Sequence, residues 1–300
     1  MTVAPLISTE ALAAHLGEDD LRIIDASWHL DDRDGRTEFE QRHLPGAVFL
    51  DLEAVSDPGS ALPHMLPSPE HFAAAVGALG VSRTDRIVVY DAAGLFSAAR
   101  VWWMFRVMGA NRVQVLDGGL PKWLAEGRPV ETGAGQDRWS TAVFEARPDA
   151  AAVVDSGQVQ AALAEALQVV DARGAARFGG EAPEPRPGVR PGHMPGAVNL
   201  PYSPLLHPRG TIKRGQALPE VFALAGVDVD RPVVTTCGSG VTPAILTLGL
   251  AMLATRSPAR TLAPTRRPRG RFGLIVRSFP ATARQSRIIG TTVQQRTARQ

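Results

Sequence analysis

Short apolar runs alternate along the chain with longer segments that carry a helical pattern. Ile87–Tyr90 and Val113–Leu116 are typical of buried strands, whereas Ala98–Met108 is typical of a helix. A further helix is predicted to begin at Ser68, because Ser suits the N-cap and the following Pro suits the first turn, and to end near Gly80. This alternation predicts an α/β fold, with a mainly parallel sheet covered by helices on both faces.

The chain contains this pattern twice. Three segments recur in the same order at offsets of 146 or 150 residues, which indicates an internal repeat. The pairs are Leu21–Ala26 with Leu167–Ala172, His43–Val48 with His193–Val198, and Arg86–Asp91 with Arg231–Cys237. The sequence therefore predicts two tandem copies of one domain, with Asp91 of the first copy aligned with Cys237 of the second.

The repeats divide the chain into four parts. These are a first domain over residues 1–135, a linker over 136–150, a second domain over 151–254 and an atypical tail over 255–300. In the first copy, strand Val113–Leu116 leads into a helix that carries Trp123, but the second copy has no such segment after Ala254. We therefore expect the second copy to lack its last strand and helix. A frameshift near residue 254 explains this better than a designed extension, although Gly273–Val276 offers a substitute strand.

Composition excludes several classes of protein. With 300 residues, 44% of them hydrophobic and 21% charged, the chain is too apolar to be disordered and long enough for two cores. The longest strongly apolar run, Ala244–Ala254, is short of the roughly 20 residues that a membrane-spanning helix needs. No basic residue precedes the apolar positions of the N-terminus, so no secretory signal is expected. The single cysteine fits a reducing compartment, and we expect a cytoplasmic protein.

Basic charge is concentrated in the tail. Residues 255–300 hold 11 arginines and no acidic residue, whereas residues 1–254 hold 21 basic and 30 acidic residues. The tail has neither the periodicity nor a motif of a folded nucleic-acid-binding domain, so we do not expect a nucleic-acid partner. The alternative, an arginine-rich nucleic-acid tail on an inactive scaffold, predicts salt-sensitive binding that truncation at Ala254 abolishes.

The single cysteine lies in a glycine-rich loop between a predicted strand, Pro232–Thr236, and an apolar helix, Pro243–Ala254. Such a turn points successive backbone N–H groups inward and adds the positive end of the helix dipole, so it favours an anion. A thiolate, which is the nucleophilic form of cysteine, suits this position better than a cysteine that only packs as a small hydrophobe. The loop residues predicted to hold the bound group are Gly238, Ser239, Gly240, Val241 and Thr242.

Three other cysteine chemistries fit this loop poorly. Cysteine phosphatases clamp phosphate with an arginine six residues after the cysteine, and that position here is Pro243. Thiol–disulfide exchange needs a second cysteine. Zinc needs a ligand spacing that one cysteine and scattered histidines do not provide. We therefore expect no metal at this loop.

Four motifs, in order along the chain, resemble those of a known family. They are His64–Pro67, Val101–Met104, His193–Ala197 and Cys237–Thr242. Together, over residues 5–254, they are similar to the two-domain rhodanese-type sulfurtransferases, most closely the 3-mercaptopyruvate sulfurtransferases. Members of that family end with a strand and a Trp-containing helix, so the resemblance stops where the internal repeat stops.

The resemblance implies a reaction that needs no cofactor. Cys237 attacks the sulfur of 3-mercaptopyruvate, pyruvate leaves, and the persulfide passes its sulfur to a thiol, thioredoxin or cyanide. A mercaptopyruvate donor is favoured over thiosulfate, because the more highly charged thiosulfate would require cations where the loop has Gly238 and Ser239. Thiosulfate remains an alternative donor.

The resemblance also implies the residues that assist Cys237. Arg177 and Arg186 match the family segments whose arginines hold the substrate. Ser239, Asp51 and His64 match the group that moves protons around the reacting thiol, which would place the site between the two copies. The first copy has Asp91 in place of the cysteine and is therefore expected to be catalytically silent. The alternative of a different class is a C-terminally damaged paralogue, inactive or weakly active, that acts as a binding protein.

Overall fold

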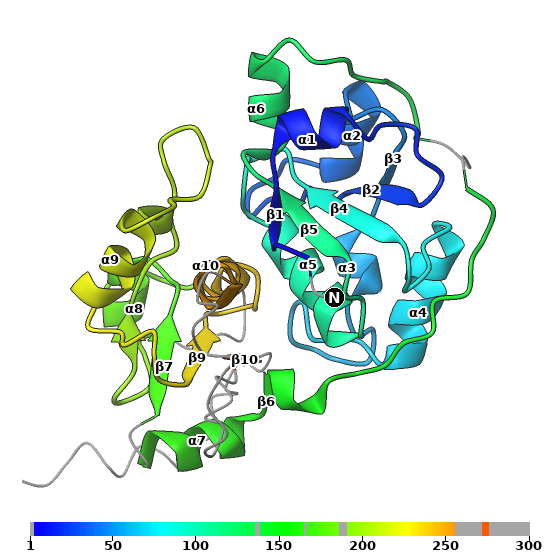
Figure 1. Cartoon of the computed structure of the whole chain (residues 1–300). Coiled ribbons are helices and arrows are strands. Elements are labelled where there is room, and N and C mark those ends of the chain that lie inside the picture. Colours follow the sequence, from blue (N-terminus) through cyan, green and yellow to red (C-terminus); the bar gives the residue numbers. More distant parts are fainter. Residues whose placement is uncertain (1–2, 136–138, 165–166, 186–190, 256–271, 276–300) are drawn as a thin grey trace, which may run out of the picture.

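The protein is described by a computed structural model that covers residues 3–135, 139–164, 167–185, 191–255 and 272–275. It contains two five-stranded sheets, and all strand pairs within them are parallel. The two sheets belong to successive halves of the chain (Figure 1). The predicted fold of two tandem α/β domains is confirmed.

The first sheet has the strand order β1-β5-β4-β2-β3. Its strands are β1 (Leu6–Ile7), β2 (Leu21–Asp25), β3 (Ala47–Phe49), β4 (Arg86–Tyr90) and β5 (Val113–Leu116). The helices of this domain are α1 (Thr9–Ala13), α2 (Gly35–Gln41), α3 (Leu52–Val55), α4 (Pro69–Ala78), α5 (Ala98–Val107) and α6 (Gly119–Ala125). Helix α4 begins as predicted, because the Ser68 side chain accepts a hydrogen bond from the backbone N–H of His71.

Helices cover both faces of this sheet (Figure 1). On one face, Leu12 of α1, Phe39 of α2 and Trp123 of α6 belong to one buried apolar cluster. On the other face, Phe72 of α4 and Phe105 of α5 belong to a second cluster, which continues into the second domain. The two domains therefore share this second apolar cluster.

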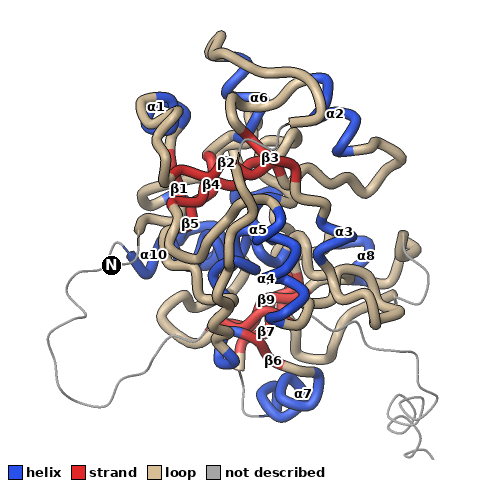
Figure 2. Tube along the Cα trace, turned by 90° about the vertical axis from the view of Figure 1, so that its right-hand side faces the viewer, coloured by secondary structure: helices blue, strands red, loops and turns tan. Residues whose placement is uncertain are grey.

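The second sheet has the equivalent order β6-β10-β9-β7-β8. Its strands are β6 (Val153–Val154), β7 (Gln168–Asp171), β8 (Val198–Asn199), β9 (Val233–Thr236) and β10 (Phe272–Ile275). The helices are α7 (Ser156–Ala164), α8 (Ala175–Gly179), α9 (Ala217–Leu224) and α10 (Pro243–Thr255), with 3-10 turns η1 (Ala150–Ala152) and η2 (Ser203–Leu205). Figure 2 shows strands of this sheet below those of the first.

Strand β10 corrects one expectation about the second domain. It pairs with β6 and β9, which is the position that β5 has between β1 and β4. The expected loss of the last strand is therefore wrong. The substitute strand predicted at Gly273–Val276 is present one residue earlier, as Phe272–Ile275. Because main-chain groups make the ladder hydrogen bonds, a strand of unrelated sequence can fill this position. The second sheet thus extends past Ala254. The predicted loss of the last helix falls on residues 256–271 and 276–300, which lie outside the described part.

Helices α5 and α10 pack against each other where the domains meet (Figure 1). Helix α10 is apolar on most of its surface and almost wholly buried, with Ile245, Leu246 and Leu248 inaccessible to solvent. Its apolar sequence is explained by burial between the domains. None of the helices within the described residues is long and apolar enough to cross a membrane.

Candidate active site

Cys237 directly follows β9, and its sulfur faces the loop that leads into α10. The backbone N–H groups of Ser239 and Gly240 lie 3.3 and 3.1 Å from Cys237 Sγ and donate to it. Gly240 has a φ of +83°, a left-handed conformation that glycine adopts without steric cost. Because α10 begins at Pro243, the positive end of its dipole also lies next to the loop. This arrangement suits a negatively charged sulfur.

The other predicted loop residues share this turn. Gly238 and Val241 are buried, and Thr242 is half-buried immediately before α10. In the described part of the chain, no group of three or more His, Cys, Asp or Glu residues is placed to hold a metal ion.

The first domain holds a carboxylate in the equivalent loop. Asp91 follows β4, and its Oδ2 accepts hydrogen bonds from the N–H groups of Phe96 (2.7 Å) and Ala98 (2.8 Å). Its Oδ1 accepts one from Ala93 at 3.0 Å. Burial raises the pKa of Asp91, although these amides act in the opposite direction. In both loops, main-chain N–H groups therefore surround the side chain that follows the strand. That side chain is a carboxylate in the first domain and a sulfur in the second.

His64 lies in the loop between α3 and α4, and its ring is fully buried. Its Nε2 is 2.8 Å from Oε1 of Glu53, which also accepts a hydrogen bond from the indole N–H of Trp28 at 3.1 Å. Asp51, predicted to act with His64, instead caps α3 by accepting hydrogen bonds from the N–H groups of Glu53 and Ala54. The carboxylate beside the imidazole is thus that of Glu53.

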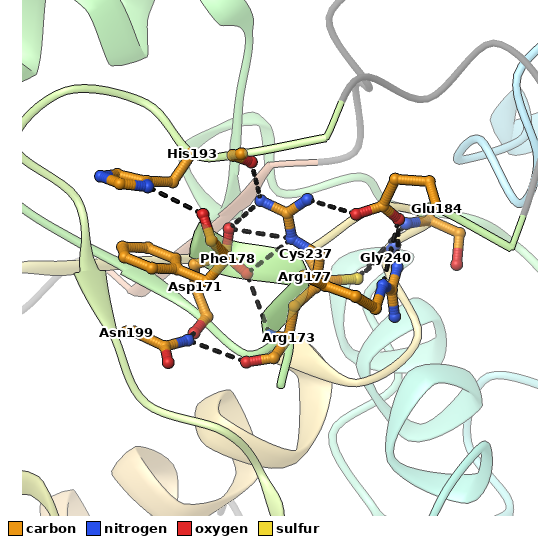
Figure 3. A network of polar contacts seen from close by, with 11 residues as sticks. Asp171, Arg173, Arg177, Phe178, Glu184, His193, Asn199, Cys237 and Gly240 are labelled. Atoms are coloured by element: carbon orange, nitrogen blue, oxygen red, sulfur yellow. Dashed lines mark hydrogen bonds and ion pairs between the residues drawn. The ribbon is translucent and has the colours of Figure 1, made fainter. Parts of the chain in front are cut away.

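Arg177 is positioned at the end of α8 by a buried network of ion pairs (Figure 3). Its guanidinium pairs with Glu184, which is only 3% exposed and also accepts a 2.6 Å hydrogen bond from Arg173. Arg173 in turn forms a bidentate pair with Asp171 at the end of β7, with Nε donating to Oδ1 and Nη2 donating to Oδ2. Burial disfavours the charged form of Glu184, but the hydrogen bonds from Arg177 and Arg173 prevail and lower its pKa. Arg186, the second predicted substrate arginine, lies outside the described residues.

Comparison with known proteins shows the family of the chain. The chain matches the family described as rhodanese-like domain over residues 8–126 and 155–260, one match for each repeat. The chain belongs to the rhodanese family. This rhodanese is 44% identical to the 3-mercaptopyruvate sulfurtransferase of Homo sapiens over 245 residues, which cover 80% of this chain and 82% of the human protein. It is 41% identical over 274 residues to "Thiosulfate/3-mercaptopyruvate sulfurtransferase 1, mitochondrial" of Arabidopsis thaliana, which cover 84% of this chain and 72% of that protein.

A solved structure supports the same grouping. The crystal structure of SseA from Escherichia coli, described as a 3-mercaptopyruvate sulfotransferase with the rhodanese fold, superimposes on this rhodanese with a TM-score of 0.80. The two chains are 37% identical, and the match covers 92% of this chain and 99% of SseA. The family predicted from the sequence motifs is therefore confirmed.

Three residues of this rhodanese belong to the site but were missed in the sequence. Glu53 is two positions after Asp51, so the sequence alone does not tell which of the two acids lies beside His64. Glu184 precedes Arg186 in a Pro-rich segment and has no local signal. Arg100 links the two loops of the site, because its guanidinium donates to the backbone carbonyls of His64 and Gly240. A charged residue in the first turn of a largely apolar helix was the signal that could have revealed it.

Proposed function

We propose that the protein is a sulfurtransferase that takes sulfur from 3-mercaptopyruvate through a persulfide on Cys237. The thiolate attacks the sulfur of the donor, and the carbon–sulfur bond breaks with its electron pair going to carbon. The proton of the donor thiol then goes to that carbon, which gives pyruvate. The observation that carries the proposal is the pair of main-chain amides aimed at Cys237 Sγ, which stabilise a thiolate before the attack and a persulfide anion after it.

The second half of the reaction releases the sulfur. A thiolate acceptor attacks the outer sulfur of the persulfide, and Cys237 leaves as a thiolate. Small thiols and thioredoxin are the acceptors that we propose, and the reaction needs no cofactor. The single cysteine suits a reducing compartment, so we propose the cytoplasm, although the Arabidopsis thaliana relative is named as mitochondrial.

Arg177 and Arg186 are the proposed partners of the substrate carboxylate. An arginine fork matches a carboxylate better than a lysine does. The Asp171–Arg173–Glu184 network supports this role for Arg177, because it limits the conformations of the guanidinium before substrate binds. We assign proton transfer to His64 with Glu53 and Ser239. The first domain, over about residues 1–135, is proposed to be catalytically silent.

Two alternatives remain testable. Thiosulfate as donor is favoured by the double name of the Arabidopsis thaliana relative. The damaged-paralogue hypothesis depended on the loss of a strand, and β10 fills that position in the sheet. Pyruvate and sulfide release should be measured with the full chain, 3-mercaptopyruvate and dithiothreitol, and sulfite release with thiosulfate in a parallel reaction. We expect turnover with mercaptopyruvate and much slower turnover with thiosulfate, and Cys237→Ser should remove both. Absence of pyruvate with the folded wild type would contradict the proposal.

A further inference from the structure

Arg100 is a cation of the first domain that is buried beneath the reacting cysteine of the second. It lies on α5 and is inaccessible to solvent. Its Nη2 donates to the backbone carbonyl of His64 at 2.7 Å, and its Nη1 donates to that of Gly240 at 3.4 Å. One guanidinium therefore joins the His64 loop to the cysteine loop across the domain interface.

Gly240 connects this guanidinium directly to the sulfur. Its carbonyl accepts from Arg100, while its N–H donates to Cys237 Sγ at 3.1 Å. A Cβ atom at position 240 would lie 3.1 Å from Nη1 of Arg100, so the loop packs closely on the guanidinium. The orientation of the peptide units that face the sulfur thus depends on where Arg100 is held.

Arg100 carries its charge without a carboxylate partner among the described residues. Within the described residues no Asp or Glu forms a salt bridge with it, and its Nε lacks a hydrogen-bond partner. The ring of Trp103 lies 4.6 Å from the guanidinium carbon and gives partial compensation. Burial lowers the pKa of Arg100 to about 9, and the charge of Cys237 acts in the opposite direction, so the group is cationic at neutral pH. Burying an unpaired cation is costly, and an anionic sulfur at Cys237 offsets that cost.

We propose that Arg100 is a positioning residue for sulfur transfer: its charge favours the anionic forms of Cys237, and its two-pronged geometry holds the cysteine loop against the His64 loop. The silent domain thereby contributes to the chemistry of the other domain. Arg100 acts through the loop and does not contact the substrate. The kinetic part of this inference rests on the proposed function, but the effect on cysteine reactivity does not.

The reactivity of the thiolate is the first readout. Cys237 is the only cysteine of the chain, so alkylation by iodoacetamide reports on it alone. We expect Arg100→Met to slow alkylation at neutral pH about tenfold, because the nearby positive charge that favours the reactive thiolate is lost. Arg100→Lys should restore most of the rate, because it keeps the charge. Arg106→Met is the matched control: it removes a charge from the same helix, but Arg106 donates to the carbonyl of Asn111 instead.

Steady-state kinetics give the second readout. Arg100→Lys should lower kcat several-fold at nearly unchanged KM, because one ammonium group does not reproduce the fork that joins two carbonyls. The proposal would be overturned if folded Arg100→Met were alkylated as fast as the wild type. It would also be overturned if Arg106→Met lost as much of the alkylation rate as Arg100→Met. If Arg100→Met does not fold, the kcat of Arg100→Lys tests the proposal, and a kcat equal to that of the wild type would overturn it. If the wild type releases no pyruvate, the alkylation rates still test Arg100, so the two failures can be told apart.

Discussion

Arg214 of the second domain pairs with Asp117 of the first, with 2.7 Å between Nη2 and Oδ2. Asp117 follows β5, and its Oδ1 accepts a 2.9 Å hydrogen bond from the buried N–H of Ile212. Arg214 lies 150 residues after His64, one of the offsets of the repeat. Equivalent loops of the two copies therefore both take part in the domain interface, one carrying His64 and the other Arg214.

The two halves of this contact should contribute unequally to stability. Asp117→Ala leaves the N–H of Ile212 buried without its acceptor, which costs about 1–3 kcal/mol. Arg214→Met removes an ion pair whose arginine is 50% exposed, which costs about 1 kcal/mol or less. Urea unfolding of both variants measures the difference. Equal losses would show that the ion pair, and not the hydrogen bond to Ile212, holds the loop.

The carboxylate that assists His64 should be that of Glu53. Glu53→Gln is expected to lower kcat at least about tenfold, because it removes the charge beside the imidazole. Asp51→Asn is the matched control, since Asn caps a helix as well as Asp and should leave kcat nearly unchanged. Steady-state pyruvate release checks both variants. A larger loss of kcat in Asp51→Asn than in Glu53→Gln would show that Asp51, and not Glu53, assists His64.

Glu184 should affect the binding of substrate more than the chemical step. Glu184→Gln weakens the ion pairs to Arg173 and Arg177, so Arg177 loses its fixed orientation and KM for mercaptopyruvate should rise about tenfold. Glu181→Gln, an exposed change in the same segment, serves as the control. Circular dichroism establishes that each variant is folded. An unchanged KM in folded Glu184→Gln would contradict the proposed role of the network.

Asp25, the last residue of β2, should make stability depend on pH. Burial raises its pKa from 3.8 to about 6, although hydrogen bonds from Ser27 and Tyr90 act against this. Between these two values the folded state binds more protons than the unfolded state, so this carboxyl makes the protein less stable as pH rises from about 4 to about 6. The contribution is at most about 3 kcal/mol.

Asp25→Asn isolates that contribution, because the amide stays neutral at every pH. Urea unfolding at pH values below and above this window should show the wild type losing stability relative to the variant as pH increases. A difference between the two proteins that does not change with pH would exclude Asp25 as its source.

The sequence alone predicted most of the fold and the centre of the site. Repeated motifs and buried strands carry their own periodicity, so two α/β domains and the alignment of Asp91 with Cys237 could be found without coordinates. The cysteine loop was found for the same reason, because its glycines, the preceding strand and the following helix are contiguous in sequence.

The missed features depend on contacts between distant segments. Arg100 and Gly240 are 140 residues apart, and only the packing of α5 on α10 brings them together. Glu53 and Asp51 differ in the direction of their side chains, which follows from the start of α3 and not from composition. Strand β10 fills its place through main-chain pairing, for which the apolar residues at Gly273–Val276 were only a weak local signal.

The central claim is that Cys237 carries the transferred sulfur. The most direct test is the mass of the peptide containing Cys237 after the full chain has reacted with 3-mercaptopyruvate and excess donor has been removed. We expect this peptide to gain one sulfur atom and to lose it again on addition of dithiothreitol. An unmodified Cys237 peptide, recovered from protein that is folded and exposed to donor, would contradict the account.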